Sequence, residues 1–279
     1  MVMKRIPVLL CAVALALNAS AQEDCNLQYD GNGDGAVDIN DVLGLLSEFA
    51  SACSPCGFES TVTFDGYTYD LIAIGDQCWF AENLRTEHYT NGDAISANLS
   101  DSEWSTTTSG AVAVYGEDEG CQNYSPDGDA CDPVWSVNEY GRLYNWYAVD
   151  DARGLCPAGW HVPTDGEWLQ LELELGMTEA QANSTGWRGT DQATQLKTTY
   201  GWYNGGNGTN SSGFSGSPVG YRSSNGFFDT AGFYSYSWSS SPDGFTAWYR
   251  NLYSDLSSVY RGAGNLRSGF SVRCLRDAE

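Results

Sequence analysis

A short acidic stretch near the amino terminus has the residue spacing of a calcium-binding loop. If the twelve-position loop starts at Asp30, oxygen donors fall where hard cations are bound, and Gly35 falls at the sharp turn. The closing residue is an aspartate, which reaches bidentate coordination less easily than the usual glutamate. The sequence therefore predicts a Ca²⁺ site. Its predicted ligands are Asp30, Asn32, Asp34, the backbone carbonyl of Ala36, Asp38 and Asp41.

A second group of candidate residues lies late in the chain, where aromatic and polar side chains alternate in β-prone segments. Aromatic rings suit sugar or protein surfaces, because they give stacking area at little cost in rotamer entropy. The alternative is that alternate members of these strands are core residues. The predicted ligand-binding residues are Trp248, Tyr249, Asn251, Tyr253, Asp255, Tyr260 and Arg261.

Signals for catalysis are weak. The chain has two histidines, His88 in a polar loop and His161 in an apolar context, and no serine or cysteine lies in a recognisable nucleophile motif. We expect His161 to make a structural hydrogen bond near the start of a helix. Paired carboxylates for glycoside hydrolysis stay open as an alternative, because acidic residues are abundant. The prediction is a protein that is not an enzyme.

The first residues have the pattern of a secretory signal peptide. Lys4 and Arg5 precede an apolar run over 6–17 that is too short to span a bilayer comfortably, and 19–21 fits a cleavage site. We expect a secreted or cell-surface protein with no membrane span in the mature chain; the alternative is an uncleaved anchor. The net charge of −23 at pH 7 disfavours nucleic acid and anionic membrane surfaces as partners.

Cysteine usage agrees with export. Nine cysteines are present, of which Cys11 lies in the predicted signal peptide. The even number that is left favours disulfides. A zinc site is the alternative, but such a site needs two CxxC pairs and the sequence has only one such pair. Spacing suggests the pairs Cys25–Cys53, Cys56–Cys78, Cys121–Cys131 and Cys156–Cys274.

The large part of the chain, from residue 58 onward, predicts strands at both ends and helices between them. A hairpin is expected over 61–64 and 67–74, with Asp65-Gly66 as its turn. At the other end, residues 270–274 alternate apolar and polar side chains, as a half-buried strand does. This order predicts an α+β fold whose two ends meet in one sheet.

The middle of the chain carries helix-start signals. Thr164 and Glu167 form a capping box before a helix that Gly176 is placed to end, and Thr178 with Gln181 repeats the signature. Before these helices, the polar segment 96–120 is expected to be a surface excursion.

The acidic continuation of that segment is expected to be a loop closed by a disulfide. A second cation site at Asp127, Asp129 and Asp132 is the alternative, although their spacing is incomplete for such a site.

Four separated segments together resemble one bacterial family. They are YDLIAIGDQCWFAENLRT, YGRLYNWYAV, GLCPAGWHVPTDGEW and GFSVRCLRD. In this order they resemble the Fibrobacter succinogenes major paralogous domain, a secreted family, over about residues 62–277. Two of the pieces are also similar to formylglycine-generating enzymes and to other members of the C-type lectin-like superfamily. These resemblances imply a compact C-type lectin-like fold with long variable loops, and a ligand face just before the final strand.

The amino-terminal stretch resembles a single dockerin repeat, with its D-x-N-x-D-G loop and a helix carrying Val42, Leu45, Leu46 and Phe49. The resemblance implies a cohesin-type scaffold as a possible partner, but cohesin-binding dockerins carry two repeats and one is found here. The predicted domains are 1–21, a signal peptide; 22–57, a calcium-binding repeat; and 58–279, a lectin-like domain.

The predicted function is the binding of an extracellular glycan or protein ligand. One alternative is a scaffold-attached or structural component of an extracellular, polysaccharide-processing assembly, joined to it through the dockerin-like repeat. The other is a hydrolase or oxidase on the same fold.

Overall fold

The computed structural model describes residues 38–52, 54–117 and 121–276, and the chain divides into two units, 1–58 and 59–279. Several predictions lie outside the described residues. These are the signal peptide, the Cys25–Cys53 pair, and the calcium ligands Asp30, Asn32, Asp34 and Ala36.

The described part of the first unit is dominated by helix α2 (Ile39–Ala52), which confirms the expected helix after the acidic loop. Two of the predicted calcium ligands, Asp38 and Asp41, lie at the start of this helix. Asp38 Oδ1 accepts from the backbone N–H of Asn40 at 2.7 Å, and the buried Asp41 carboxylate accepts from the N–H of Asp38 at 2.8 Å. Both carboxylates therefore stabilise backbone donors that the first helical turn leaves without partners.

A five-stranded antiparallel sheet brings both ends of the second unit together. Strands β1 and β2 form the predicted hairpin, and its turn residues Asp65 and Gly66 take the positive φ values of +47° and +79° that such a turn requires. The last strand, β13, pairs with β3 and β6, which confirms that the ends share a sheet. The strand order is β1 (Thr61–Phe64), β2 (Tyr67–Ile74), β3 (Gln77–Phe80), β13 (Leu275–Arg276) and β6 (Trp160–His161).

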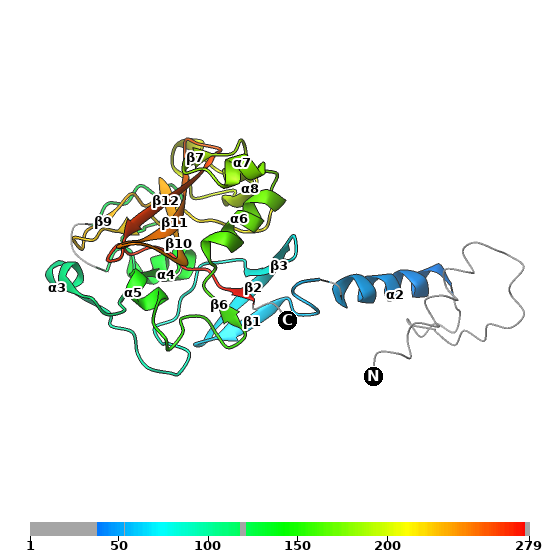
Figure 1. Cartoon of the computed structure of the whole chain (residues 1–279), viewed down its shortest axis with the longest axis horizontal. Helices are drawn as coiled ribbons and strands as arrows, with labels where there is room; N and C mark the ends of the chain where they lie inside the picture. Colours follow the sequence, from blue (N-terminus) through cyan, green and yellow to red (C-terminus); the bar gives the residue numbers. More distant parts are fainter. Residues whose placement is uncertain (1–37, 53, 118–120, 277–279) are drawn as a thin grey trace, which may run out of the picture. The chain divides into compact units, whose positions relative to one another are not determined.

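The late aromatic segments form three strands of a second, four-stranded antiparallel sheet, and β7 is its fourth strand (Figure 1). Helices α5 (Trp146–Val149) and α6 (Asp165–Glu174) both contact its edge strand β10. Its order is β10 (Tyr234–Asp243), β11 (Thr246–Tyr253), β12 (Val259–Asn265) and β7 (Gly186–Arg188). Two small pairs complete the strands: β4 (Val112–Ala113) with β5 (Leu143–Tyr144), and β8 (Tyr221–Arg222) with β9 (Phe228–Asp229).

The helices of the second unit are short. Helix α6 begins with the predicted capping box, in which Thr164 and Glu167 each accept from the other's backbone N–H, and Gly176 follows its last turn with φ +94°. Helix α7 has the second predicted box, at Thr178 and Gln181. The helices are α3 (Asp101–Thr106), α4 (Pro133–Tyr140), α5 (Trp146–Val149), α6 (Asp165–Glu174), α7 (Glu179–Ala182), α8 (Gln192–Leu196) and the 3₁₀ turn η1 (Tyr203–Gly205).

Two expectations about burial were wrong. The described part of the segment 96–120, residues 96–117, is not a surface excursion, because α3 places Trp104 in the core, where its indole N–H donates to the carbonyl of Arg267 at 2.6 Å. Residues 270–274 are buried on both sides of the segment rather than on one. Arg273 is buried there because it donates to Asn83 Oδ1 at 3.0 Å and to the carbonyl of Ser215 at 2.8 Å. Partners distant in the sequence thus determine burial at both places.

Disulfides connect parts of the fold as predicted. Cys121–Cys131 and Cys156–Cys274 are both formed. Cys56 and Cys78 are also disulfide-bonded, as their predicted pairing requires. Helices and strands are mixed throughout the unit, which confirms the α+β class. None of the described helices is long and apolar enough to cross a membrane.

Candidate binding face

The four-stranded sheet has two chemically different faces. Residues that pair across antiparallel strands share a face, and neighbours along a strand point to opposite faces. The register pairs Tyr253 with Tyr234 and Asn251 with Tyr260, so these side chains lie on one face. We call this the tyrosine face. Its aromatic members are Trp187, Tyr234, Tyr236, the fully buried Trp238, Tyr249, Tyr253 and Tyr260.

The rings of the tyrosine face contact one another across all four strands. Tyr234 stacks on Tyr253 with centroids 4.4 Å apart, and Tyr249 stacks on Tyr260 at 5.7 Å. Trp187 on β7 meets Tyr260 edge-on at 5.3 Å. The tyrosines are half-buried and Trp187 is 41% exposed. Flat, partly exposed rings of this kind form a stacking surface whose geometry is fixed before a ligand arrives.

A buried amide lies in the middle of this face. Asn251 is paired with Tyr236 on one side and Tyr260 on the other, and only 4% of it is exposed. Its Oδ1 atom is buried and has no hydrogen-bond partner in the described structure, whereas the amide also makes a hydrogen bond with the Tyr236 hydroxyl. Such an acceptor costs about 1–3 kcal/mol when it is left without a donor. A buried polar atom without a partner marks a place where an external donor is favoured.

The hydroxyl groups of the face are also perturbed. Burial raises the pKa of Tyr236 and of Tyr249 above the usual value. The hydroxyl of Tyr253 donates to Asp255 Oδ2 at 2.9 Å, and this bond is the largest cause that raises its pKa to about 12. These hydroxyls therefore stay protonated at neutral pH, and the Tyr253 hydroxyl, whose hydrogen is donated to Asp255, still has lone pairs that can accept a hydrogen bond. Asp255 adds an exposed carboxylate.

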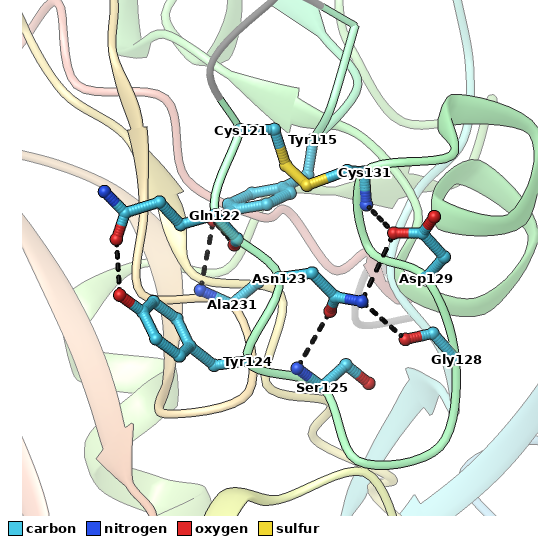
Figure 2. Close-up of a disulfide and its surroundings, with 10 residues drawn as sticks. All are labelled: Tyr115, Cys121, Gln122, Asn123, Tyr124, Ser125, Gly128, Asp129, Cys131 and Ala231. Atoms are coloured by element: carbon cyan, nitrogen blue, oxygen red, sulfur yellow. Dashed lines mark hydrogen bonds between the residues drawn. A yellow bond between two sulfur atoms is a disulfide. The ribbon is translucent and has the colours of Figure 1, made fainter.

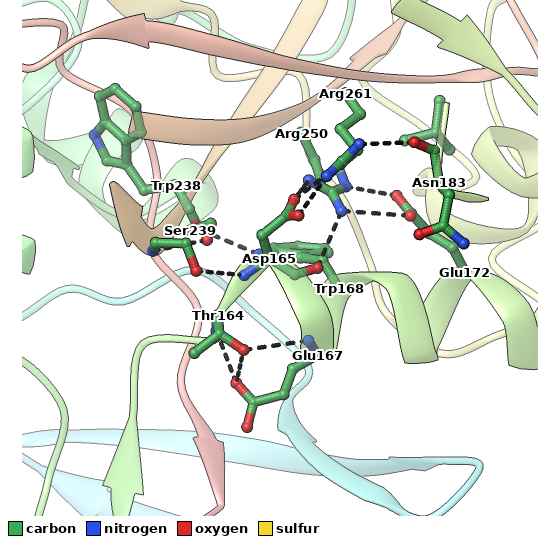
Figure 3. Close-up of polar contacts among 12 residues, drawn as sticks. Thr164, Asp165, Glu167, Trp168, Glu172, Asn183, Trp238, Ser239, Arg250 and Arg261 are labelled. Carbon is green, nitrogen blue, oxygen red and sulfur yellow. Dashed lines mark hydrogen bonds and ion pairs between the residues drawn. The ribbon is translucent and has the colours of Figure 1, made fainter. Parts of the chain in front are cut away.

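The opposite face of the sheet, which we call the arginine face, carries Arg188, Arg250 and Arg261. Figure 3 shows Asp165 and Glu172 of α6 pointing toward Arg250 and Arg261. Glu172 is fully buried and lies 2.6 Å from both Arg188 Nη2 and Arg250 Nε. This network of ion pairs attaches helix α6 to the back of the tyrosine face.

The predicted binding residues are therefore divided between the two faces. Tyr249, Asn251, Tyr253 and Tyr260 lie on the tyrosine face, and Asp255 follows its strand β11. The remaining two, Trp248 and Arg261, belong to the arginine face, so the structure does not bring all seven together.

Arg261 serves the fold on that side. Its guanidinium lies 4.2 Å from the Trp248 ring centroid and donates to Asp165 Oδ2 at 2.6 Å. Burial would raise the pKa of Asp165, but the hydrogen bonds and charges of Arg261 and Arg250 lower it below the usual value.

His161 makes the structural contact that was predicted. Its Nε2 lies 2.9 Å from Glu167 Oε1, the residue that closes the capping box of α6. In the described parts of the chain, no three or more His, Cys, Asp or Glu side chains are grouped so as to hold a metal.

The three aspartates considered for a second cation serve separate backbone donors instead. Asp127 accepts from Gly201, Asp129 accepts from Cys131, and Asp132 caps α4.

The domain of the described fold has a recognisable sequence family. A family model described as the Fibrobacter succinogenes major domain matches residues 72–276. The chain belongs to this family. The matched residues include all of the tyrosine face and all of the arginine face. A search of curated proteins and a search of solved structures each found no match.

Sequence reasoning missed part of the tyrosine face. Tyr234 and Tyr236 alternate with serines in the segment GFYSYSW, and that spacing was sufficient to place them on one face of their strand. Trp187 had no such signal, because β7 has three residues and pairs with a strand distant in the sequence.

Proposed function

We propose that this protein is an extracellular, non-catalytic binding protein, and that the tyrosine face of its C-type lectin-like domain binds a glycan. The observation that carries the proposal is the unpaired Oδ1 of Asn251 among partly exposed aromatic rings. A sugar has the two matching features. Its apolar C–H face stacks on aromatic rings, and its hydroxyl groups donate to buried acceptors.

The composition of the face favours a neutral glycan over a nucleic acid or a charged protein patch. Its aromatic residues carry no positive charge, and the overall charge of −23 repels polyanions. Asp255 gives a second acceptor beside Tyr253 for a further sugar hydroxyl. A protein ligand is the other occupant to which such a surface is suited, and the binding experiment distinguishes the two.

The experiment is a glycan array probed with the purified whole chain and two variants. Trp187→Ala removes the most exposed ring of the face, and we expect the affinity for any glycan bound by the wild type to fall about tenfold. Phe245→Ala is the matched control, because this phenylalanine is 97% exposed and lies in the turn between β10 and β11. No glycan binding, or equal loss in both variants, contradicts the proposal.

We also propose that the amino-terminal unit binds Ca²⁺ in order to fold. A segment of about 35 residues buries too little apolar surface to be stable without a metal or disulfide. The hydrogen bonds at Asp38 and Asp41 are compatible with this role, because a carboxylate offers about four lone-pair sites. Calcium would neutralise the acidic loop. We expect Asp38→Ala to lower the Ca²⁺ affinity measured by calorimetry, and no heat of binding in the wild type contradicts the proposal.

The protein is further proposed to be exported and cleaved after Ala21, the small residue at the end of the predicted cleavage site. Amino-terminal sequencing of the secreted protein tests this, and the expected first residue is Gln22.

A further inference from the structure

The chain has two lysines, and one of them is buried against the turn that follows strand β11. Lys4 lies in the predicted signal peptide. Lys197 comes directly after helix α8, and only 3% of it is exposed. A lysine is rarely buried unless neighbouring groups compensate its charge. The contacts of its ammonium group therefore indicate what this residue does.

The ammonium group of Lys197 donates to three backbone carbonyls of residues 253–256, which we call the β11–β12 turn. Its Nζ lies 3.2 Å from each of the carbonyl oxygens of Tyr253, Ser254 and Leu256. An ammonium has three N–H donors that point in different directions, whereas the five donors of arginine lie in one plane. Three converging carbonyls therefore suit a lysine, and they use every donor of its head group.

The rest of the side chain is fixed by other parts of the fold. The backbone N–H of Lys197 donates to the carbonyl of Ala193 at 2.9 Å, and a β-bridge joins Lys197 to Gly216. A Cβ atom on Gly208 would lie 2.7 Å from Cβ of Lys197, so the chain packs closely on the stem. The ammonium also lies 5.1 Å from the Trp202 ring centroid. Neighbours outside the β11–β12 turn thus determine where the cation lies.

The β11–β12 turn carries two residues of the candidate binding face. Tyr253 belongs to the tyrosine face, and its hydroxyl donates to Asp255 Oδ2 at 2.9 Å. The Ser254 hydroxyl donates to Asp255 Oδ1 at 3.1 Å. Two hydroxyls of the turn therefore orient the carboxylate, while the backbone that carries them is bound to Lys197. A displacement of this backbone would move the Tyr253 ring and the Asp255 carboxylate together.

A second support of the turn does not depend on charge. The N–H of Ser254 donates to the carbonyl of Phe233 at 2.8 Å. The Phe233 ring meets Tyr124 edge-on, with centroids 5.1 Å apart. Figure 2 shows Tyr124 on the loop that the Cys121–Cys131 disulfide closes. This support consists of a backbone hydrogen bond and ring packing, so a change of pH acts on the turn through Lys197.

The charge of Lys197 is sensitive to pH. Burial lowers the pKa of Lys197 to about 8, and the negative charge of Asp255 acts against this shift. Among the described residues, Asp255 is the one charged group that shifts it, and Tyr253 is the other titratable group of the turn. A neutral amine has two N–H donors and a lone pair. One of the three carbonyls would then lose its donor and face that lone pair.

We propose that Lys197 is a positioning residue of the tyrosine face, because its ammonium holds the β11–β12 turn in the conformation that presents Tyr253 and Asp255 to the glycan. This inference rests on the proposed glycan binding and makes that binding depend on one buried charge. Lys197 does not touch the glycan. The apparent affinity falls in proportion to the fraction of molecules in the binding-competent conformation, which here is the fraction with a charged Lys197.

Calorimetric titration of the whole chain with the glycan that the array identifies tests this dependence. We expect the wild-type affinity to fall about tenfold between about pH 7 and pH 9, because a pKa of about 8 lowers the charged fraction by that factor. Folding lowers the pKa of Lys197, so the unfolded chain binds more protons above about pH 8 and this group's contribution to stability rises with pH. A loss of affinity without a loss in melting temperature therefore separates positioning from unfolding.

A variant and a measurement without glycan assign the effect to Lys197. Lys197→Met keeps most of the stem without the charge, and it should bind more weakly than wild type, with an affinity that does not change over this pH range. Isotope-labelled lysine resolves the titration of Lys197 in nuclear magnetic resonance spectra, because the sequence has two lysines. The amide signals of Ser254 and Leu256 should shift with the same midpoint. The amide of Phe245, between β10 and β11, should not.

Two results overturn this proposal alone. One is a wild-type affinity that stays constant over this pH range or falls equally in Lys197→Met. The other is a set of turn amide signals that do not follow the titration of Lys197. Absence of glycan binding at every pH is a different result, because it overturns the proposed function and this proposal with it.

Discussion

Replacing Glu172 by glutamine tests the role of the arginine face in holding the sheet. Its carboxylate lies 2.6 Å from Nη2 of Arg188 and 2.6 Å from Nε of Arg250. The side chains of all three residues are at most 3% exposed. Glutamine keeps the shape of the side chain but removes the negative charge. Arg188 then loses its carboxylate partner, and Arg250 retains only Asp165.

The magnitude follows from this burial. Breaking a buried ion pair by removing one partner costs about 3–5 kcal/mol, whereas an exposed pair contributes about 0–1 kcal/mol. For a unit of this size, each kcal/mol lowers the melting temperature by about 2–4 °C. We therefore expect Glu172→Gln to lower the free energy of unfolding by about 3–5 kcal/mol, and the melting temperature by about 6–20 °C by the same relation.

Urea unfolding followed by tryptophan fluorescence measures the loss. Glu174→Gln is the matched control, because it is exposed on the same helix and should change stability by less than about 0.5 kcal/mol. The double variant Glu172→Gln/Arg188→Met should lose less than the sum of its single changes, by about 1–3 kcal/mol. A loss below about 1 kcal/mol for Glu172→Gln, or strict additivity in the double variant, would refute the reasoning.

The remaining predictions concern other buried links. Arg273→Met should cost about 3 kcal/mol in urea unfolding, because it leaves buried acceptors unpaired; a neutral effect contradicts this. Replacing Cys156 and Cys274 by alanine opens a link across 118 residues and should cost about 4 kcal/mol; unchanged melting contradicts it. The lowered pKa of Asp165 contributes stability above about pH 4, and this stability is lost as the pH falls through the folded-state pKa. Asp165→Asn should therefore flatten the dependence of unfolding free energy on pH below pH 4. An unchanged slope of that dependence contradicts the prediction.

Local features of the fold were predictable from the sequence. The β1–β2 hairpin needed only two β-prone runs around Asp65-Gly66, and α6 needed only Thr164 and Glu167. In both cases the interacting residues lie within a few positions of one another. The short disulfide Cys121–Cys131 belongs to the same class, because its two cysteines bracket one loop.

Features that depend on distant partners were not predictable in this way. Arg273 reads as the polar side of a strand, but it is buried because Asn83, 190 positions away, accepts its hydrogen bond. Trp104 reads as part of a polar loop, but it is buried in the core. A single sequence contains no signal for such pairings.

The candidate face lies between these two cases. The sequence identified strands β11 and β12 as the place of aromatic and polar side chains, but it grouped Trp248 and Arg261 with residues of the opposite face. Period-two alternation was enough to separate Trp248 from Tyr249.

The central claim is that the buried amide of Asn251 accepts a hydrogen bond from a bound sugar. The most direct measurement compares wild type with Asn251→Leu, using a glycan identified on the array, with calorimetric affinity and melting temperature both recorded. Leucine has a similar volume and removes the unpaired oxygen, together with the amide hydrogen bond to Tyr236. Because these two effects on stability oppose each other, the account predicts a melting temperature close to that of the wild type, together with a loss of glycan affinity of about tenfold or more. Unchanged affinity, or a melting temperature that falls by several degrees, would contradict it.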